Sequence, residues 1–277
     1  MGFFMKCFRT ILLFIFLINF TKSFCNNDNY PVGSRASGMG NASVIYSDIW
    51  SSFHNQAGLA SFNKLAFGLY NESWFTDPPV GIKALLFSIP INKSTFGISL
   101  RHYSFISINE QKFGVAYSRK LSDKVAAGIQ LNYHRMHVSS YYGNGYAISA
   151  EGGIIIEPIK NFFIGAHIFN PTFSKIKRFS EEYIPVIFRI GAGYYFSDKV
   201  NGCFEIEKYI NYKPSYKTGF EYNFYRSFFL RFGGSTNPNR INGGFGFGIY
   251  DVKADIAFVY YQVFGLIPNI SLSYNIK

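Results

Sequence analysis

The sequence predicts an all-β protein, a 14-stranded antiparallel transmembrane β-barrel with a small N-terminal plug (hatch) segment. Three observations carry this prediction. Apolar residues alternate with polar or small residues along fourteen segments, which is the period of a β-strand. Within each segment the bulky side chains share one face and the small ones share the other. The connections between segments alternate between short and longer, as in outer-membrane barrels.

The composition excludes several other classes of protein. Of the 277 residues, 48% are hydrophobic, 20% are aromatic and only 16% are charged, which argues against general disorder. No stretch after the N-terminus approaches the ~20 apolar residues that a membrane helix needs. The net charge is +11, but no basic cluster interleaved with stacking aromatic residues stands out. We therefore expect no nucleic-acid partner.

The first 25 residues have the pattern of a secretory signal peptide. Lys6 and Arg9 precede a short apolar core at 11–20, and Ser23 and Cys25 fit a cleavage site before Asn26. Removal of this segment takes Cys7 and Cys25 with it. Cys203 is then the remaining cysteine, so the exported protein has no internal disulfide.

The barrel itself is predicted over 64–277. The alternating segments lie near 65–72, 79–89, 94–104, 110–119, 124–136, 145–156, 161–169, 184–196, 199–209, 214–224, 226–235, 241–250, 254–263 and 269–276. Longer connections are expected at 71–79, 137–144 and 171–183. Both termini then fall at the end with the short turns, which is the periplasmic end of an outer-membrane barrel and requires an even number of strands.

The two faces of the predicted strands favour a membrane barrel over a soluble β-sandwich or barrel. In 214–224, for example, Tyr216, Phe220 and Tyr222 oppose Lys217 and Glu221. Across the strands the non-apolar face is mostly Gly, Ala, Ser and Asn with few charges, which suits a crowded interior better than a surface in water. The bulky face would then contact lipid, and a closed barrel leaves no unpaired edge in the bilayer.

Ahead of the barrel, 33–60 reads GSRASGMGNASVIYSDIWSSFHNQAGLA. Four features stand out: 33–36 (GSRA), then 38–42 (GMGNA), then Asp48 with Trp50-Ser51, and finally 55–60 (NQAGLA). With these features the segment resembles the N-terminal segment of the FadL-like superfamily of outer-membrane barrels, and most of all its short PorV/PorQ-type members in the Bacteroidetes. Fourteen strands is also that superfamily's number, and the strand count above does not depend on the motif.

The resemblance implies a hatch over 26–63 that folds back into the lumen. Its family motif Asn-Pro-Ala-Gly corresponds here to Asn55, Gln56, Ala57 and Gly58. Gln56 departs from the family's proline, and glutamine neither fixes φ nor removes a backbone donor. A rigid turn at this point, and a gating role tied to it, are therefore in question. The alternative is a purely structural plug.

A polar cluster is predicted on the inner face of the barrel. Charged residues on that face would need to be paired in a lumen of low dielectric constant, and five of them come from consecutive strands, where opposite charges stabilise a ladder. The cluster serves either as an ion-pair network that braces the wall or plug, or as a polar path for a solute. Its members are Arg101, Arg189, Glu205, Glu207, Lys217, Glu221 and Arg231.

The sequence shows no Walker loop, dinucleotide fingerprint, nucleophile elbow or metal-ligand spacing. We therefore expect no enzyme activity, cofactor or metal. The expected setting is a monomer among outer-membrane lipids. Two functions stay open: passage of a small hydrophobic solute, as the wider superfamily implies, or partnership with a secretion-system protein as an accessory of export or surface assembly, as PorV/PorQ-type relatives imply. A partner would dock on exposed apolar loop residues, with candidates Tyr141, Tyr142, Phe173 and Phe179.

Overall fold

The computed structural model describes residues 31–75, 80–106, 108–138, 143–177, 183–225 and 227–276. The predicted signal peptide at 1–25 lies outside the described residues, as do Tyr141, Tyr142 and Phe179. Phe173 is described, and 58% of it is exposed.

Within the described residues, fourteen strands form one closed antiparallel barrel. Each strand pairs with its neighbours in the sequence, and β1 closes the ring by pairing with β14, with Ala66 opposite Asn275. This confirms the predicted fold class. The strands are β1 (Ala66–Phe75), β2 (Val80–Ile91), β3 (Ser94–Phe105), β4 (Ile108–Ser122), β5 (Val125–Val138), β6 (Gly143–Ile159), β7 (Phe162–Phe169), β8 (Ile187–Tyr195), β9 (Val200–Tyr209), β10 (Ser215–Tyr225), β11 (Phe228–Ser235), β12 (Arg240–Ile249), β13 (Val252–Tyr261) and β14 (Gly265–Asn275).

Two of the predicted long connections are shorter than predicted. β1 continues to Phe75, β5 continues to Val138 and β6 begins at Gly143, so 71–75 and 137–138 belong to strands. Most outward positions of these extensions are polar, including Asn71, Ser73, His137 and Asn144, which weakens the polarity contrast from which strands are recognised. The 170–186 connection is long, as predicted. We call the barrel end that carries it the loop end, and the opposite end, where β14 finishes, the turn end.

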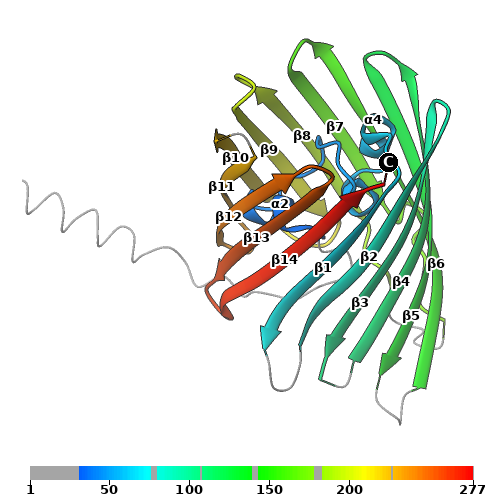
Figure 1. Cartoon of the computed structure of the whole chain (residues 1–277). Helices are drawn as coiled ribbons and strands as arrows, with labels where there is room; N and C mark the ends of the chain where they lie inside the picture. The colour runs from blue at the N-terminus through cyan, green and yellow to red at the C-terminus, as the bar shows by residue number, and fades with distance from the viewer. Residues whose placement is uncertain are drawn as a thin grey trace, which may run out of the picture.

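The strands differ in length around the barrel. β2 to β6 have 12, 12, 15, 14 and 17 residues, whereas β7 to β14 have between 8 and 11. Figure 1 shows β3 to β6 reaching further than β1 and β14 toward the bottom of the view, which is the loop end. A transmembrane strand needs about 9–11 residues, so this side of the wall is taller than a bilayer requires.

The faces of the strands are sorted as the alternation predicts. In β10, Tyr216, Phe220 and Tyr222 are about half exposed on the outside, while Lys217 and Glu221 are buried inside. The same division holds on the other strands, so large apolar side chains cover the outer surface of the barrel.

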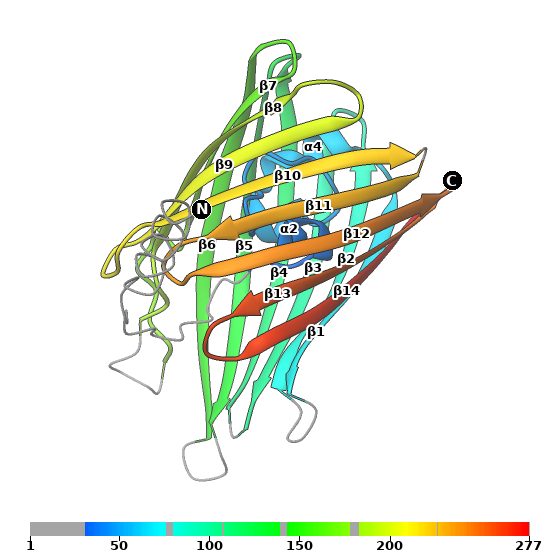
Figure 2. The same cartoon turned by 90° about the vertical axis from the view of Figure 1, so that its left-hand side faces the viewer.

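The N-terminal segment 31–63, which we call the hatch, lies inside the ring of strands, as both Figure 1 and Figure 2 show. Its helices are short: α2 (Ser34–Gly38), α3 (Ser51–His54) and α4 (Ala57–Phe62). No helix in the described ranges is both long and apolar enough to cross a membrane. Most of the hatch is buried, and Val32, Met39, Ala57 and Leu59 are completely so.

Candidate functional site

Inward-facing glycines in the wall make room for the hatch. A Cβ atom on Gly128 would lie 2.6 Å from the backbone of Gln56, and one on Gly233 would lie 2.3 Å from the backbone of Met39 and of Gly40. Gly40 has φ +68°, a conformation that favours glycine. A side chain there would also meet the backbone of Gly234 on β11 and of Thr218 on β10 at 2.6 Å. The hatch backbone is therefore in direct contact with the wall backbone.

The predicted hatch motif is buried where the hatch contacts the wall. Asn55, Gln56, Ala57 and Gly58 are all buried. The amide of Asn55 donates to the carbonyl of Val44 at 2.8 Å and also contacts the carbonyls of Ile154 and Ala166, on β6 and β7. Its side-chain oxygen accepts the Ala57 N–H at 3.2 Å. Asn55 thus fastens the start of α4 both to the rest of the hatch and to the wall.

The turn at Gln56 forms without proline. Gln56 has φ −57°, which lies within the range that a proline ring imposes. Its side-chain amide donates to the carbonyl of Ser52 at 3.1 Å, and the residue is completely buried. Packing and this hydrogen bond therefore hold the backbone of Gln56 in the conformation that a proline ring would impose.

One half of the predicted polar cluster surrounds Glu221. This carboxylate accepts two hydrogen bonds from the guanidinium of Arg35, at 3.0 and 2.8 Å, and one from Arg231 at 2.6 Å. Arg231 also pairs with Asp255 at 2.7 Å, and Arg35 with Asp48 at 3.2 Å. Arg35 belongs to the hatch, so Glu221 joins the hatch to the wall. Burial opposes the charge of Arg35, but the combined attraction of Glu221, Tyr195, Asp48 and Tyr46 outweighs it, and the pKa of Arg35 lies well above its ordinary value.

The other half surrounds Lys217. Its ammonium contacts Glu205 at 3.0 Å and Glu207 at 2.9 Å, and Arg189 donates to Glu207 at 2.6 Å. Glu205 in turn accepts the backbone N–H groups of Ser43 and Val44 in the hatch, at 2.8 and 2.9 Å. Arg101 stands apart from both halves, on β3, where it pairs with Glu110 at 3.8 Å.

A third buried group was not among the predicted site residues. The Glu151 carboxylate accepts hydrogen bonds from Lys112 at 2.8 Å, Gln130 at 2.8 Å and Asn132 at 2.9 Å, and contacts His167 at 3.1 Å. Lys112 and Glu151 occupy inward positions of β4 and β6, so the same alternation that identified the other charges could have found them.

His54 gives the hatch a dependence on pH. The buried ring donates from Nε2 to the Val32 carbonyl at 2.6 Å, and burial lowers its pKa from 6.5 to about 4, although Asp48 and Glu205 oppose this shift and Arg189 adds to it. Between these two pH values the unfolded chain binds a proton that the folded chain does not. We expect the free energy of unfolding to fall, by on the order of 3 kcal/mol, as the pH drops from 6.5 to 4.

The measurement is urea unfolding of the detergent-solubilised barrel across this range. His54→Gln is the control, because it keeps a donor for Val32 and does not titrate. An equally steep fall in the control would assign the acid sensitivity to other groups.

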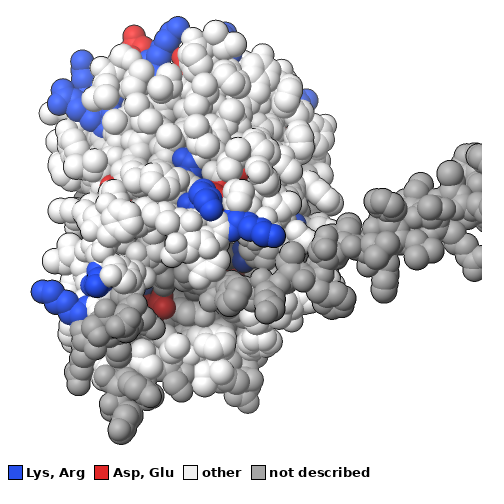
Figure 3. Space-filling model, turned by 180° about the vertical axis from the view of Figure 1, so that it is seen from behind, with Lys and Arg blue, Asp and Glu red and all other residues white. Residues whose placement is uncertain are grey.

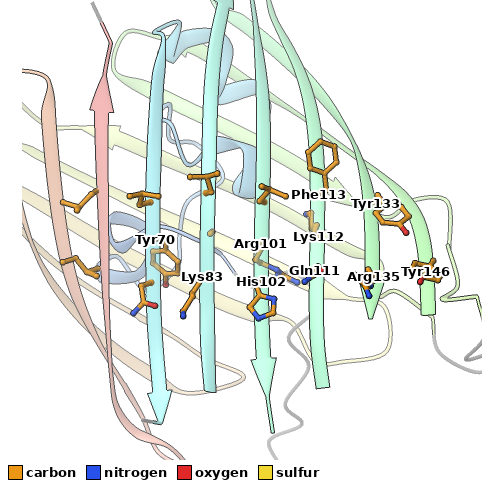
Figure 4. A pocket seen from close by; sticks show the side chains of 17 residues that line it. Tyr70, Lys83, Arg101, His102, Gln111, Lys112, Phe113, Tyr133, Arg135 and Tyr146 are labelled. Atoms are coloured by element: carbon orange, nitrogen blue, oxygen red, sulfur yellow. The ribbon is translucent and has the colours of Figure 1, made fainter. Parts of the chain in front are cut away.

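A separate cavity of about 1130 Å³ lies on the outside of the wall, across β14 and β1 to β6. Outward side chains form its rims, including Leu100 and Phe113 on one side and Lys83 and Arg135 on the other. The strand pairing is continuous across it, so the cavity is a groove in the surface and not an opening into the lumen. Figure 4 shows it from close by. Sequence reasoning missed it because a groove depends on the register between strands.

Comparisons with known proteins give the fold a context. No protein-family model matches the chain, and no curated protein matches it in sequence. Among solved structures, the chain is similar to the toluene transporter TbuX of Ralstonia pickettii, with a TM-score of 0.72, 11% identity, and coverage of 91% of this chain and 100% of the other. It is similar to the toluene transporter TodX of Pseudomonas putida, with a TM-score of 0.65, 12% identity, and coverage of 91% and 98%.

A FadL homologue of Pseudomonas aeruginosa is also similar, with a TM-score of 0.63, 11% identity, and coverage of 88% of this chain and 98% of the other. At these identities the likeness is one of fold. The chain therefore has a FadL-like fold, with a closed 14-stranded barrel and a short helical N-terminal segment.

Proposed function

We propose that this chain lies in the outer membrane of a bacterium, with its termini in the periplasm, and passes a small hydrophobic solute across that membrane. The observation that carries the proposal is the fold. This fold is shared with two toluene transporters over nine tenths of this chain. In this chain, the N-terminal hatch lies inside the barrel.

The outer surface supports the placement in a membrane. Ile129, Ile148 and Phe232 are 64%, 69% and 70% exposed, and large apolar side chains surround the barrel. Figure 3 shows one face of the molecule as mostly uncharged, with Lys and Arg gathered in patches. A barrel in water would bury such side chains, whereas in a bilayer they contact lipid and cost nothing.

The position of the hatch supports a gating role. Its contacts reach strands around the barrel, from Gly68 on β1, beside Trp50, to Gly244 on β12, beside Gly38. A solute that travels along the lumen must therefore displace the hatch. Displacement of the hatch can be tested at Cys203 on β9, because its thiol contacts the carbonyl of the hatch residue Ala42 at 3.4 Å.

An Ala42→Cys substitution tests both passage and gating. The new thiol can form a disulfide with Cys203 and lock the hatch to the wall. We expect uptake of radiolabelled toluene, by Gram-negative cells that carry the variant in their outer membrane, to fall to the empty-vector level under oxidant and to recover with dithiothreitol. The matched control, Ala42→Cys with Cys203→Ala, cannot form the disulfide and should take up toluene in both conditions.

Two outcomes would count against parts of the proposal. Equal uptake by the locked and the reduced barrel would show that the solute does not pass the hatch. Uptake at the empty-vector level by the unmodified barrel would remove passage of this solute altogether.

The second candidate function is a non-transporting accessory barrel of protein secretion or cell-surface assembly, of the PorV/PorQ type. One observation favours it: two separate buried carboxylates, Glu205 and Glu221, bind the hatch, and a plug that never moves would be held in this way. A barrel that shows no uptake but co-purifies with a secretion-system protein would support this function.

A further inference from the structure

We propose that the groove on the outer wall binds a membrane lipid that carries two phosphates. This inference rests on the proposed placement of the barrel in a bilayer, but it does not depend on passage of a solute. The groove is distinct from the lumen, because most of its lining side chains face outward and the unbroken wall separates it from the hatch. Four buried residues of that wall also line it, namely Tyr70, Ala84, Arg101 and Lys112.

One rim of the groove is apolar. It is formed by residues that face outward at the same level of neighbouring strands, since Leu69 is opposite Leu85, Leu85 opposite Leu100, and Leu100 opposite Phe113. Tyr133 continues the row on β5. Leu69, Leu100, Phe113 and Tyr133 are each at least 40% exposed. This rim is part of the apolar outer surface, and the acyl chains of a lipid can pack against it.

The other rim is polar and basic. It lies two residues further along each strand, toward the loop end, and the pairing places its members side by side across five strands (Figure 4). The row consists of Asn71, Lys83, His102, Gln111 and Arg135. Amide, ammonium and guanidinium groups are all hydrogen-bond donors, and phosphate oxygens accept from each of them.

The next outward row confirms that the polar rim marks a boundary. It runs Ser73, Gly81, Ser104, Asn109, His137 and Asn144, and none of these side chains is apolar. The surface thus changes from apolar to polar within one step along the strands, at the groove. In a membrane, the level where apolar wall meets polar wall is the level of the lipid headgroups.

The charge of the rim selects the headgroup. Within the described residues, the outward face of β1 to β6 carries no acidic side chain, so Lys83 and Arg135 have no carboxylate beside them on that face. The buried cations behind the groove are already committed, since Lys112 pairs with Glu151 at 2.8 Å and Arg101 with Glu110. The outward charges are therefore available to an anion, and basic side chains at this level attract anionic lipid.

The spacing of the charges favours two phosphates over one. Lys83 is on β2 and Arg135 on β5, so three steps between strands separate them, which amounts to roughly 14 Å. A single phosphate would contact both side chains only if both extended along the rim toward each other. One phosphate beside Lys83 and His102, and a second beside Arg135 and Gln111, would occupy the whole rim.

The test is lipid retention by the purified full-length mature barrel. Native mass spectrometry would compare lipid A with two phosphates, monophosphoryl lipid A, phosphatidylcholine, and inorganic phosphate. We expect retention in that order, with inorganic phosphate not retained. Lys83→Gln and Arg135→Gln should each weaken retention of the two-phosphate lipid about fivefold, and the double variant about thirtyfold.

The matched control is Lys208→Gln with Lys213→Gln, which removes two exposed charges near the loop end of β9 and β10. It should leave retention unchanged. Equal retention of phosphatidylcholine, or an equal loss in the control, would overturn the inference. Retention of free phosphate would point to an anion site that needs no lipid. A barrel that does not insert into vesicles would instead overturn the proposed membrane placement.

Discussion

Replacing Glu221 by glutamine is expected to lower the free energy of unfolding by about 3–5 kcal/mol. The substitution keeps the shape of the side chain and removes the charge that Arg35 and Arg231 share. Both guanidinium groups are then left in a buried place without this carboxylate. When one partner of a buried ion pair is lost, the desolvation of the other partner is no longer compensated. The loss of stability is therefore larger than that from breaking a surface salt bridge.

The measurement is urea unfolding of the barrel in detergent, with Glu157→Gln as the matched control. Glu157 is near the end of β6, where its carboxylate accepts the N–H of Asn161 at 3.0 Å. We expect that control to change stability by no more than about 0.5 kcal/mol. If Glu221→Gln and Glu157→Gln lowered the free energy of unfolding by similar amounts, the buried ion pairs of Glu221 would contribute no more to stability than the contact of Glu157.

The second large effect is expected from Gly233→Ala. The added methyl group would lie 2.3 Å from the hatch backbone, so the hatch must shift, at a cost of about 1–3 kcal/mol. Cys203 reports the shift, because its buried thiol lies against the hatch. We expect the rate of Cys203 labelling by a maleimide reagent to rise by on the order of tenfold, in proportion to the open population.

Gly243→Ala is the control for this experiment. It is on the neighbouring strand β12 and faces outward, and a Cβ there would come no nearer than 4.0 Å to another residue. Its labelling rate should equal that of the unmodified barrel. If Gly233→Ala also left the rate unchanged, the hatch would not be seated on this strand in solution.

The strands were the most predictable part of the molecule. Alternation of side-chain size and polarity located each of the fourteen observed strands, because a strand can be recognised from the two-residue period of its side chains alone. It missed the end of β1, where Asn71, Glu72 and Ser73 make both faces polar and the contrast disappears. The division into signal peptide, hatch and barrel stays a prediction.

The candidate sites were predictable only in part. Parity along a strand indicates that a charge such as Glu221 points inward, but the position of its partner Arg35, 186 residues away, depends on how the hatch folds back. The outer groove shows the same limit, since Lys83 and His102 become neighbours only through the register of β2 and β3. Alternation specifies a face and restricts the register to steps of two residues, but which of those steps is used depends on the turns.

The way in which the hatch is fastened also sets the order of assembly. Ser34 donates its N–H to Ser271, Asn242 donates to the carbonyl of Ser37, and Asn269 donates to its hydroxyl, across 237, 205 and 232 positions of sequence. Contacts this distant form late, because the chain between them must first be ordered. The hatch precedes every strand in the sequence and is thus secured last, after the final hairpin has paired. Until then the polar groups of the hatch lack these wall partners, and the barrel closes before its centre is filled.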